Sequence, residues 1–232
     1  MDPDSFSYTA LLQDDQAAEV IDAMMAIDSQ GYTIIKCSQP CEEKSAAVEA
    51  AIGSELYEEK KSDETPTHHF EGPFRSQKWT AANEFMDYGV NMTYICQAFL
   101  DIPFKRARFT KPRVVRRIET TSELRPLKMR VRDHQPGQVV SLIRPFRTSL
   151  SPENGFFSVY IGSHKMGDEE FEELEKHGAL TLREVRVRPD DILIVAQGLR
   201  VKYANGKGAI WVWKAISNGL AGASVESQVD QY

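Results

Sequence analysis

Short segments in which apolar and charged side chains alternate recur through residues 127–216, and they constrain the fold of this chain more than any other feature. The first segment shows the pattern most clearly: Leu127, Lys128, Met129, Arg130, Val131 and Arg132. A period of two is typical of a strand whose side chains point to opposite faces. Turn residues separate the segments, and Asn205-Gly206 is a strong hairpin signal. The pattern predicts strands at 127–132, 139–148, 156–161, 181–187, 192–196, 200–204 and 209–216.

The first hundred residues predict helices instead. Apolar side chains at helical spacing indicate helices over 16–28, 45–58 and 80–100. A short strand is expected at 32–36, a polar loop at 59–78, and one more short helix at 168–177. Helices followed by antiparallel-looking strands predict an α+β fold. The strands close most easily as a two-sheet jelly roll, with the N-terminal helices packed on one sheet.

The chain is expected to form a single domain over residues 1–232, because it is long enough to bury a core. Hydrophobic residues make up 41% and charged residues 27% of the sequence, values that are ordinary for a soluble globular protein. Within the domain we expect a mainly helical layer in 1–100, a β core in 127–216 and a frayed tail in 217–232.

Charge is distributed unevenly, although the net charge is only −6. Residues 1–66 are acidic, and residues 104–132 are rich in lysine and arginine. Two interpretations stay open: the two surfaces face each other or solvent, or segment 104–117 contacts a partner protein. A nucleic-acid partner is not expected, because the basic segment has no aromatic residues beyond Phe104 and Phe109 and no binding motif.

Cysteine content and the N-terminus favour a cytoplasmic protein. Three cysteines, Cys37, Cys41 and Cys96, are too few for a disulfide framework. No signal peptide is visible, and no apolar run approaches the roughly 20 residues of a membrane span. Cys37 and Cys41 could form a zinc set with His68-His69, but this spacing matches no standard site, so no metal is predicted there.

Three stretches together resemble a known family. They are Gly31-Tyr32 after the first helix, Leu-Ser-Pro-Glu-Asn-Gly at 150–155 followed by Gly-Ser-His-Lys at 162–165, and Pro-Asp-Asp-Ile-Leu-Ile-Val at 189–195. Their order is similar to that of phytanoyl-CoA-dioxygenase-like proteins over most of residues 16–216. The resemblance implies a double-stranded β-helix of the iron- and 2-oxoglutarate-dependent oxygenases.

The family pattern is incomplete in this chain. The family holds iron with a His-x-Asp/Glu pair and a distal His, and it holds 2-oxoglutarate with a cation. The first pair resembles His134-Gln135-Pro136, in which proline replaces the carboxylate. The distal His position falls at Val201 and the Arg position near Ile210, and no histidine occurs in 178–232. Standard turnover is therefore not expected, and no cofactor is predicted unless iron and 2-oxoglutarate bind through other ligands.

Strand alternation then predicts which side chains line a pocket. If His134 faces the interior, Arg132 and Arg130 lie on the same side; if Val201 and Ile210 face in, so do Tyr203 and Lys214, with Trp211 and Trp213 facing out. We predict a catalytic set of His134, Tyr203 and Arg132, and a substrate-binding set of Arg130, Lys214, Arg144, Val201 and Ile210. The alternative is that these cations lie solvated at the mouth of the barrel.

Three hypotheses about function follow, and the sequence leaves open whether the chain is an enzyme. The first is a metal-independent isomerase, cyclase or lyase acting on an anionic or carbonyl-bearing organic molecule, with His134 as general acid–base. The second is a non-catalytic descendant that binds a ligand or a protein. The third is an oxygenase with non-standard ligands, such as His68 or His69 from the loop.

Overall fold

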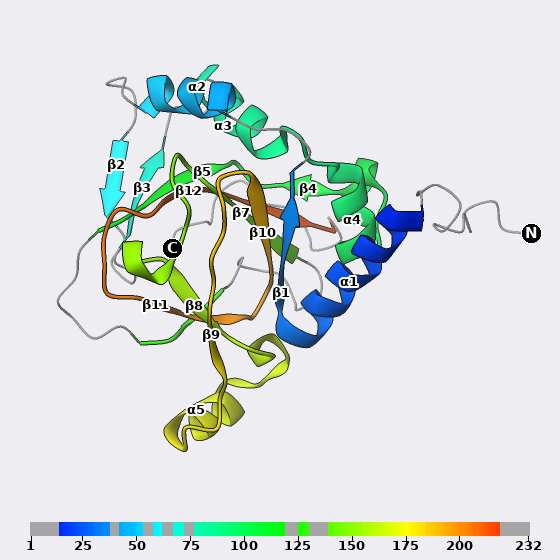
Figure 1. The fold of residues 1–232 in the computed structure, drawn as a ribbon, viewed down its shortest axis with the longest axis vertical. Coiled ribbons are helices and arrows are strands. Elements are labelled where there is room, and N and C mark those ends of the chain that lie inside the picture. Colours follow the sequence, from blue (N-terminus) through cyan, green and yellow to red (C-terminus); the bar gives the residue numbers. More distant parts are fainter. Residues whose placement is uncertain are drawn as a thin grey trace, which may run out of the picture.

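The structure is a computed structural model that describes residues 14–37, 42–52, 58–61, 67–71, 77–118, 125–129 and 139–218. It contains helices and antiparallel strands, so the α+β class is confirmed (Figure 1). The α-helices are α1 (Asp14–Gln30), α2 (Glu42–Ile52), α3 (Gln77–Asp87), α4 (Met92–Leu100) and α5 (Asp168–Lys176). Three short 3-10 turns are η2 (Phe104–Arg106), η3 (Pro152–Asn154) and η4 (Ser163–Lys165). No helix in the described part of the chain is long and apolar enough to cross a membrane.

The strands form two antiparallel sheets. The large sheet has the order β1-β10-β7-β12-β5-β3-β2, with β4 also paired to β12, and the small sheet has the order β6-β11-β8-β9. In the large sheet the strands are β1 (Tyr32–Lys36), β2 (Glu58–Lys61), β3 (Thr67–Glu71), β4 (Arg108–Phe109), β5 (Arg113–Arg117), β7 (Val139–Pro145), β10 (Asp191–Ala196) and β12 (Ile210–Ser217). In the small sheet they are β6 (Leu127–Lys128), β8 (Phe157–Tyr160), β9 (Leu182–Glu184) and β11 (Arg200–Tyr203).

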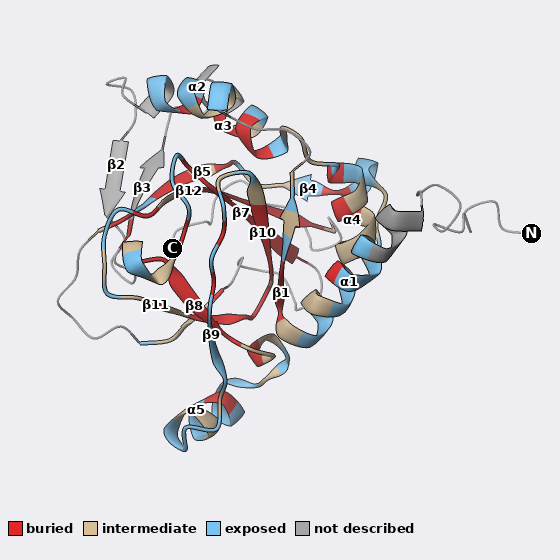
Figure 2. Cartoon of the chain, viewed as in Figure 1, coloured by how far each residue is buried: buried red, intermediate tan, exposed pale blue. Residues whose placement is uncertain are grey.

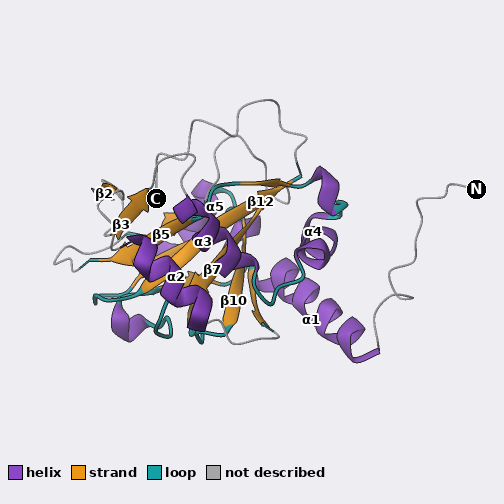
Figure 3. Cartoon of the chain, turned by 90° about the horizontal axis from the view of Figure 1, so that it is seen from above, coloured by secondary structure: helices purple, strands orange, loops and turns teal. Residues whose placement is uncertain are grey.

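Two apolar cores lie on opposite faces of the large sheet. The inner core joins the two sheets, because Val115, Ile143 and Trp211 of the large sheet pack with Phe157 and Val201 of the small one. The outer core joins the large sheet to the helices and includes Val48, Phe85, Ile95, Leu142 and Val212. Figure 3 shows α2 and α3 lying over the strands of the large sheet, and Figure 2 shows buried residues on β7, β8, β10 and β12. The helical layer therefore covers one sheet, and the other face of that sheet meets the small sheet.

The predicted helix over 80–100 is in fact two helices. Gly89 adopts a left-handed backbone (φ 69°), which ends the first helix. The side chain of Asn91 then accepts a hydrogen bond from the Tyr94 amide and caps α4. The apolar stripe that suggested one long helix continues through this break, because both helices pack on the same outer core.

Two regions that were not expected to form strands extend the large sheet. The predicted loop 59–78 contains most of β2 and all of β3, and the basic segment contains β4 and β5. Strand β3 pairs with β5, so that Thr67 lies opposite Arg117 and His69 opposite Val115. Residues 108–109 and 113–117 of the basic segment are therefore strands of the large sheet, and a partner protein for segment 104–117 stays a prediction.

Candidate functional site

The Ser-Pro-Glu-Asn-Gly loop, the most distinctive sequence motif, forms a structural junction. Ser151 and Asn154 make a reciprocal capping box around η3, and Gly155 follows with φ 86°. The guanidinium of Arg117 donates to the carbonyls of Gly155 (3.1 Å), Ala204 (3.0 Å) and Ile118. The loop is thereby fixed to β5 and to the turn after β11.

The second motif, Gly-Ser-His-Lys, fastens the end of α1 to the small sheet. The Nε2 atom of His164 lies 3.1 Å from the Asp28 carbonyl oxygen, and the Lys165 ammonium lies 2.7 Å from the Asp28 carboxylate. A carbonyl only accepts hydrogen bonds, so Nε2 carries the proton. The Nδ1 atom is buried and has no partner among the described residues. A β-carbon on Gly31 would approach Nδ1 to 2.7 Å, which explains glycine at this position.

Acidification should destabilise the protein through His164. Burial lowers the pKa of His164 from its ordinary value of 6.5. At a pH below that value the unfolded chain binds a proton that the folded chain does not, so stability falls as pH decreases toward the folded-state pKa. Urea unfolding at about pH 7 and about pH 5 should show a loss that His164→Asn reduces. The exposed His177 provides the control: a His177→Asn protein that lost the same pH dependence would contradict this assignment.

Strand register determines which side chains face the interior, and it reverses part of the expectation for β12. Trp211 and Trp213 belong to the inner core, whereas Val212 and Ile210 pack on the outer core beneath the helices. Val201 and Tyr203 on β11 face inward as predicted. The expectation that Ile210 shares the interior with Val201 is wrong, because Ile210 packs on the outer core, whereas Val201 of the small sheet belongs to the inner core.

Lys214 and Arg144 also lie away from the interior. The Lys214 ammonium is 2.9 Å from the Asp87 carboxylate at the end of α3. Arg144 donates to the carbonyls of Phe85 (2.6 Å) and Tyr88 (2.7 Å), so it closes the C-terminal end of the same helix. Their placement as substrate-binding residues of an interior pocket is therefore incorrect. Both cations instead hold α3 on the large sheet.

Three predicted site residues, His134, Arg132 and Arg130, lie outside the described residues. The structure therefore neither places them together nor separates them, and their roles stay predictions. Of the predicted set, Tyr203 and Val201 are the members whose side chains are described in the interior. Burial raises the pKa of Tyr203, so its phenol stays protonated at neutral pH and can donate a hydrogen bond.

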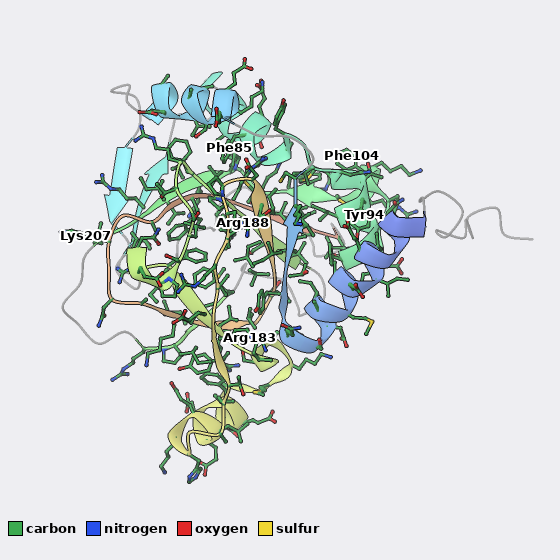
Figure 4. All side chains as sticks on the ribbon, viewed as in Figure 1. Phe85, Tyr94, Phe104, Arg183, Arg188 and Lys207 are labelled. Carbon is green, nitrogen blue, oxygen red and sulfur yellow. The ribbon has the colours of Figure 1, made fainter. Side chains whose placement is uncertain are left out.

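A small cavity with a polar border lies among the described residues of the interior. Thr67, Arg113 and Tyr203 line it with six apolar side chains, namely Val115, Met129, Ile143, Phe157, Trp211 and Trp213. Its volume is about 20 Å³, which is room for a single water molecule. Figure 4 shows side chains filling the space between the sheets. The described interior is thus well packed, with a few polar groups converging on one point.

Arg113 is a polar interior residue that the sequence did not reveal, as is Thr67, which lies in the predicted loop 59–78. Arg113 lies on β5 opposite Trp213, and paired residues of antiparallel strands share a face. The available signal was the pattern Arg113-Val-Val-Arg-Arg117, in which Arg113, Val115 and Arg117 alternate with Val114 and Arg116. The abundance of cations in this segment concealed that period.

Comparison with known proteins shows the fold. No family model and no curated protein matches the sequence. Among solved structures, AviO1 from Streptomyces viridochromogenes Tue57 superposes with a TM-score of 0.62 at 15% identity, over 88% of this chain and 97% of that chain. HygX from Streptomyces hygroscopicus gives 0.60 at 16% identity, over 84% and 85%. The non-heme alpha-ketoglutarate-dependent epimerase SnoN from nogalamycin biosynthesis gives 0.62 at 11% identity, over 93% of both chains. The chain therefore shares the fold of these proteins.

These structures contradict the prediction that no cofactor is involved. HygX has been solved with nickel, 2-oxoglutarate and hygromycin B bound, and SnoN with Fe³⁺, alpha-ketoglutarate (2-oxoglutarate) and nogalamycin RO. Metal and 2-oxoglutarate thus accompany this fold in proteins that superpose over most of the chain. The sequence lacks residues of the family motif, but this lack alone was not a sufficient reason to predict that no cofactor binds.

The described residues do not fit the metal by themselves. Among them, no group of three His, Cys, Asp or Glu side chains could hold a metal ion. The described lining of the cavity offers a guanidinium and two hydroxyls, but no imidazole or carboxylate. A molecule the size of 2-oxoglutarate also exceeds the cavity, so its entry requires the aromatic walls to move. Candidate ligands are His134, outside the described ranges, and His69, whose backbone lies opposite the inward-facing Val115.

Proposed function

We propose that this chain binds and converts a small organic molecule that carries a carboxylate or another carbonyl group, in the interior between the two sheets. The observation that carries the proposal is the polar border of the interior cavity, formed by Arg113, Thr67 and Tyr203 among aromatic and aliphatic walls. Apolar walls with a few convergent polar groups are typical of small-molecule sites.

The fold supports the same class of ligand. HygX and SnoN hold 2-oxoglutarate, and SnoN is an epimerase, so the fold is compatible with an isomerase-type reaction. 2-Oxoglutarate is therefore the first carboxylate to test. We also propose that the chain has the double-stranded β-helix of the phytanoyl-CoA-dioxygenase-like proteins that its sequence resembles.

Each polar residue has a role that follows from its chemistry. The planar guanidinium of Arg113 can bind a carboxylate through two parallel hydrogen bonds. The protonated phenol of Tyr203 can donate to a carbonyl oxygen of the same molecule. His134 would act as general acid–base and Arg132 as a second donor, both as sequence-based proposals. A metal would add Lewis-acid or redox chemistry when bound.

A second candidate function is a non-catalytic descendant that binds a ligand or a protein partner outside the filled interior. The packing of the described interior favours it, because Trp211, Trp213 and Phe157 leave about 20 Å³ between them. The two candidates differ in one measurable property. A site that converts a substrate must open to admit it, whereas a filled core should not respond to 2-oxoglutarate.

Titration of the protein with 2-oxoglutarate and manganese(II) under anaerobic conditions tests the proposal. We expect calorimetric binding and a change in tryptophan fluorescence, because Trp211 and Trp213 border the cavity. Arg113→Ala should weaken 2-oxoglutarate binding about tenfold or more, the equivalent of a lost charge-assisted hydrogen bond. The neighbouring Arg116 is exposed, so Arg116→Ala should bind as the parent protein does. Absence of binding by the parent protein would overturn the interior site and leave the second candidate.

Metal content is measured separately, on protein equilibrated with manganese(II) alone. Stoichiometric metal that disappears in His134→Ala or His69→Ala would identify non-standard ligands, with His177→Ala as the control because His177 lies on the exposed end of α5. Binding of 2-oxoglutarate that is independent of both histidines would assign the interior to the carboxylate alone.

A further inference from the structure

The small sheet carries a second, larger cavity on its outer face. Nine described residues line it: Arg125, Pro126, Lys128, Asp168, Phe171, Glu172, Glu175, Arg200 and Lys202. Its volume is about 710 Å³, within the range of roughly 300–1,000 Å³ that is common for small-molecule sites. None of these residues lines the interior cavity. We call this space the α5 groove; α5 projects from the small sheet in Figure 1.

Alternation along β6 and β11 separates the groove from the interior. Lys128, Arg200 and Lys202 line the groove, whereas the intervening Met129 and Val201 belong to the inner core. Side chains of successive strand residues point to opposite faces, so each strand serves both spaces. An inference about the groove therefore does not depend on the function proposed for the interior.

The groove is held in shape by Arg200, which is nearly inaccessible to solvent (5% exposed side chain). Its guanidinium donates to the carbonyls of Ser163 (3.1 Å) and Gly167 (3.2 Å) and to the Asp168 carboxylate. It also lies 4.2 Å from the centre of the Phe171 ring. The start of α5 is thus fixed to β11 by charge-assisted hydrogen bonds and by packing.

The two walls of the groove carry opposite charges. On the strand side, Lys128 and Arg200 share the carboxylate of Asp168, which leaves one positive charge in excess, and Arg125 and Lys202 add two more. On the helix side, Glu172 and Glu175 contribute negative charge, and Glu175 accepts a hydrogen bond from the Tyr160 hydroxyl (3.2 Å). A ligand with a single charge would satisfy one wall and be repelled by the other.

We propose that the α5 groove binds a small organic molecule with an anionic group at one end and an amino group at the other. The phosphate or carboxylate lies against Arg125, Lys128 and Lys202, and the ammonium lies against Glu172 and Glu175. This arrangement matches each charge of the ligand to the wall of opposite sign.

Three sugars of similar size test the proposal in calorimetric titrations at low salt. Glucosamine 6-phosphate has both charged groups, glucose 6-phosphate lacks the amine, and glucosamine lacks the phosphate. We expect glucosamine 6-phosphate to bind about tenfold tighter than either relative, because each charge-assisted contact contributes on that scale. Equal affinity for the two phosphates, or no binding of any of the three, would overturn the proposal.

Variants at exposed or partly exposed positions assign the two ends without threatening the fold. Glu172→Gln should remove the preference for glucosamine 6-phosphate over glucose 6-phosphate, and Lys202→Ala should weaken both phosphates by a similar factor of about five to ten. Glu170 lies on the same helix outside the groove, and Arg188 lies far from α5 (Figure 4). The Glu170→Gln and Arg188→Ala proteins should therefore bind the probes as the parent protein does. Equal losses in the controls would show that net charge alone attracts the probes.

Discussion

Replacing Arg117 with alanine should lower the free energy of unfolding by about 3–5 kcal/mol, the largest effect we expect from a single side chain in this protein. Arg117 is 1% exposed and donates to the carbonyls of Gly155, Ala204 and Ile118. Its guanidinium also packs against the Tyr203 ring, 5.6 Å from the ring centre. Removal leaves the buried carbonyl of Gly155 and the part-buried carbonyls of Ala204 and Ile118 without this donor, and it creates a cavity beside Tyr203.

The neighbouring Arg116 supplies the matched control. It lies on the same strand with its side chain exposed, so Arg116→Ala should change stability by less than about 0.5 kcal/mol. Urea unfolding followed by tryptophan fluorescence measures both variants, since Trp211 and Trp213 are buried in the inner core. Equal stability of the two alanine variants would mean that the Arg117 hydrogen bonds contribute nothing.

Gly155→Ala should be the second strongly destabilising change, at about 3 kcal/mol or more. The backbone of Gly155 has φ 86°, which disfavours any residue with a β-carbon. A β-carbon built there would also lie 2.6 Å from the carbonyl oxygen of Gly206 and 2.7 Å from Cγ of Arg117. The first of these atoms belongs to backbone, so a simple side-chain rotation cannot relieve the contact.

Gly167 provides the comparison for this change. It has an ordinary extended conformation (φ −65°), and a β-carbon there would meet no atom within 4 Å. Gly167→Ala should therefore alter the unfolding midpoint only slightly, within about 1 kcal/mol for loss of a glycine N-cap. Thermal unfolding of both variants gives the measurement, and a Gly155→Ala protein as stable as Gly167→Ala would contradict the tight junction between Gly155 and Gly206.

Sequence patterns predicted the strand segments better than they predicted the faces. Strand β1 was predicted with its observed bounds, and β12 to within one residue at each end. The inward face of β12 was assigned wrongly because both of its faces are buried. A strand with two apolar faces gives no inside–outside signal. Lys214 looked like a pocket residue, but it is 4% exposed because Asp87 neutralises it from α3.

Tertiary contacts explain the remaining differences. Strand β5 was not predicted, because its arginines looked like solvent-exposed residues of a basic segment. Arg117 is buried because it donates to the carbonyls of Gly155 and Ala204, which only the folded chain brings close to it. The break between α3 and α4 depends on Gly89 and Asn91, signals that the continuous apolar stripe outweighed. The motif at 151–155 lies between two predicted strands, as the structure confirms, but its function as a junction depends on Gly206, which is distant in sequence.

The position of β12 has a consequence for how the protein is made. It is the last described strand in the chain, yet it lies in the middle of the large sheet, between β7 on one side and β5 and β4 on the other. During synthesis β5 and β7 emerge well before their shared partner, so their edges stay open until residues 210–217 leave the ribosome. A nascent chain arrested before Ile210 should therefore bind chaperones that capture exposed strands, and release from them should coincide with the arrival of β12.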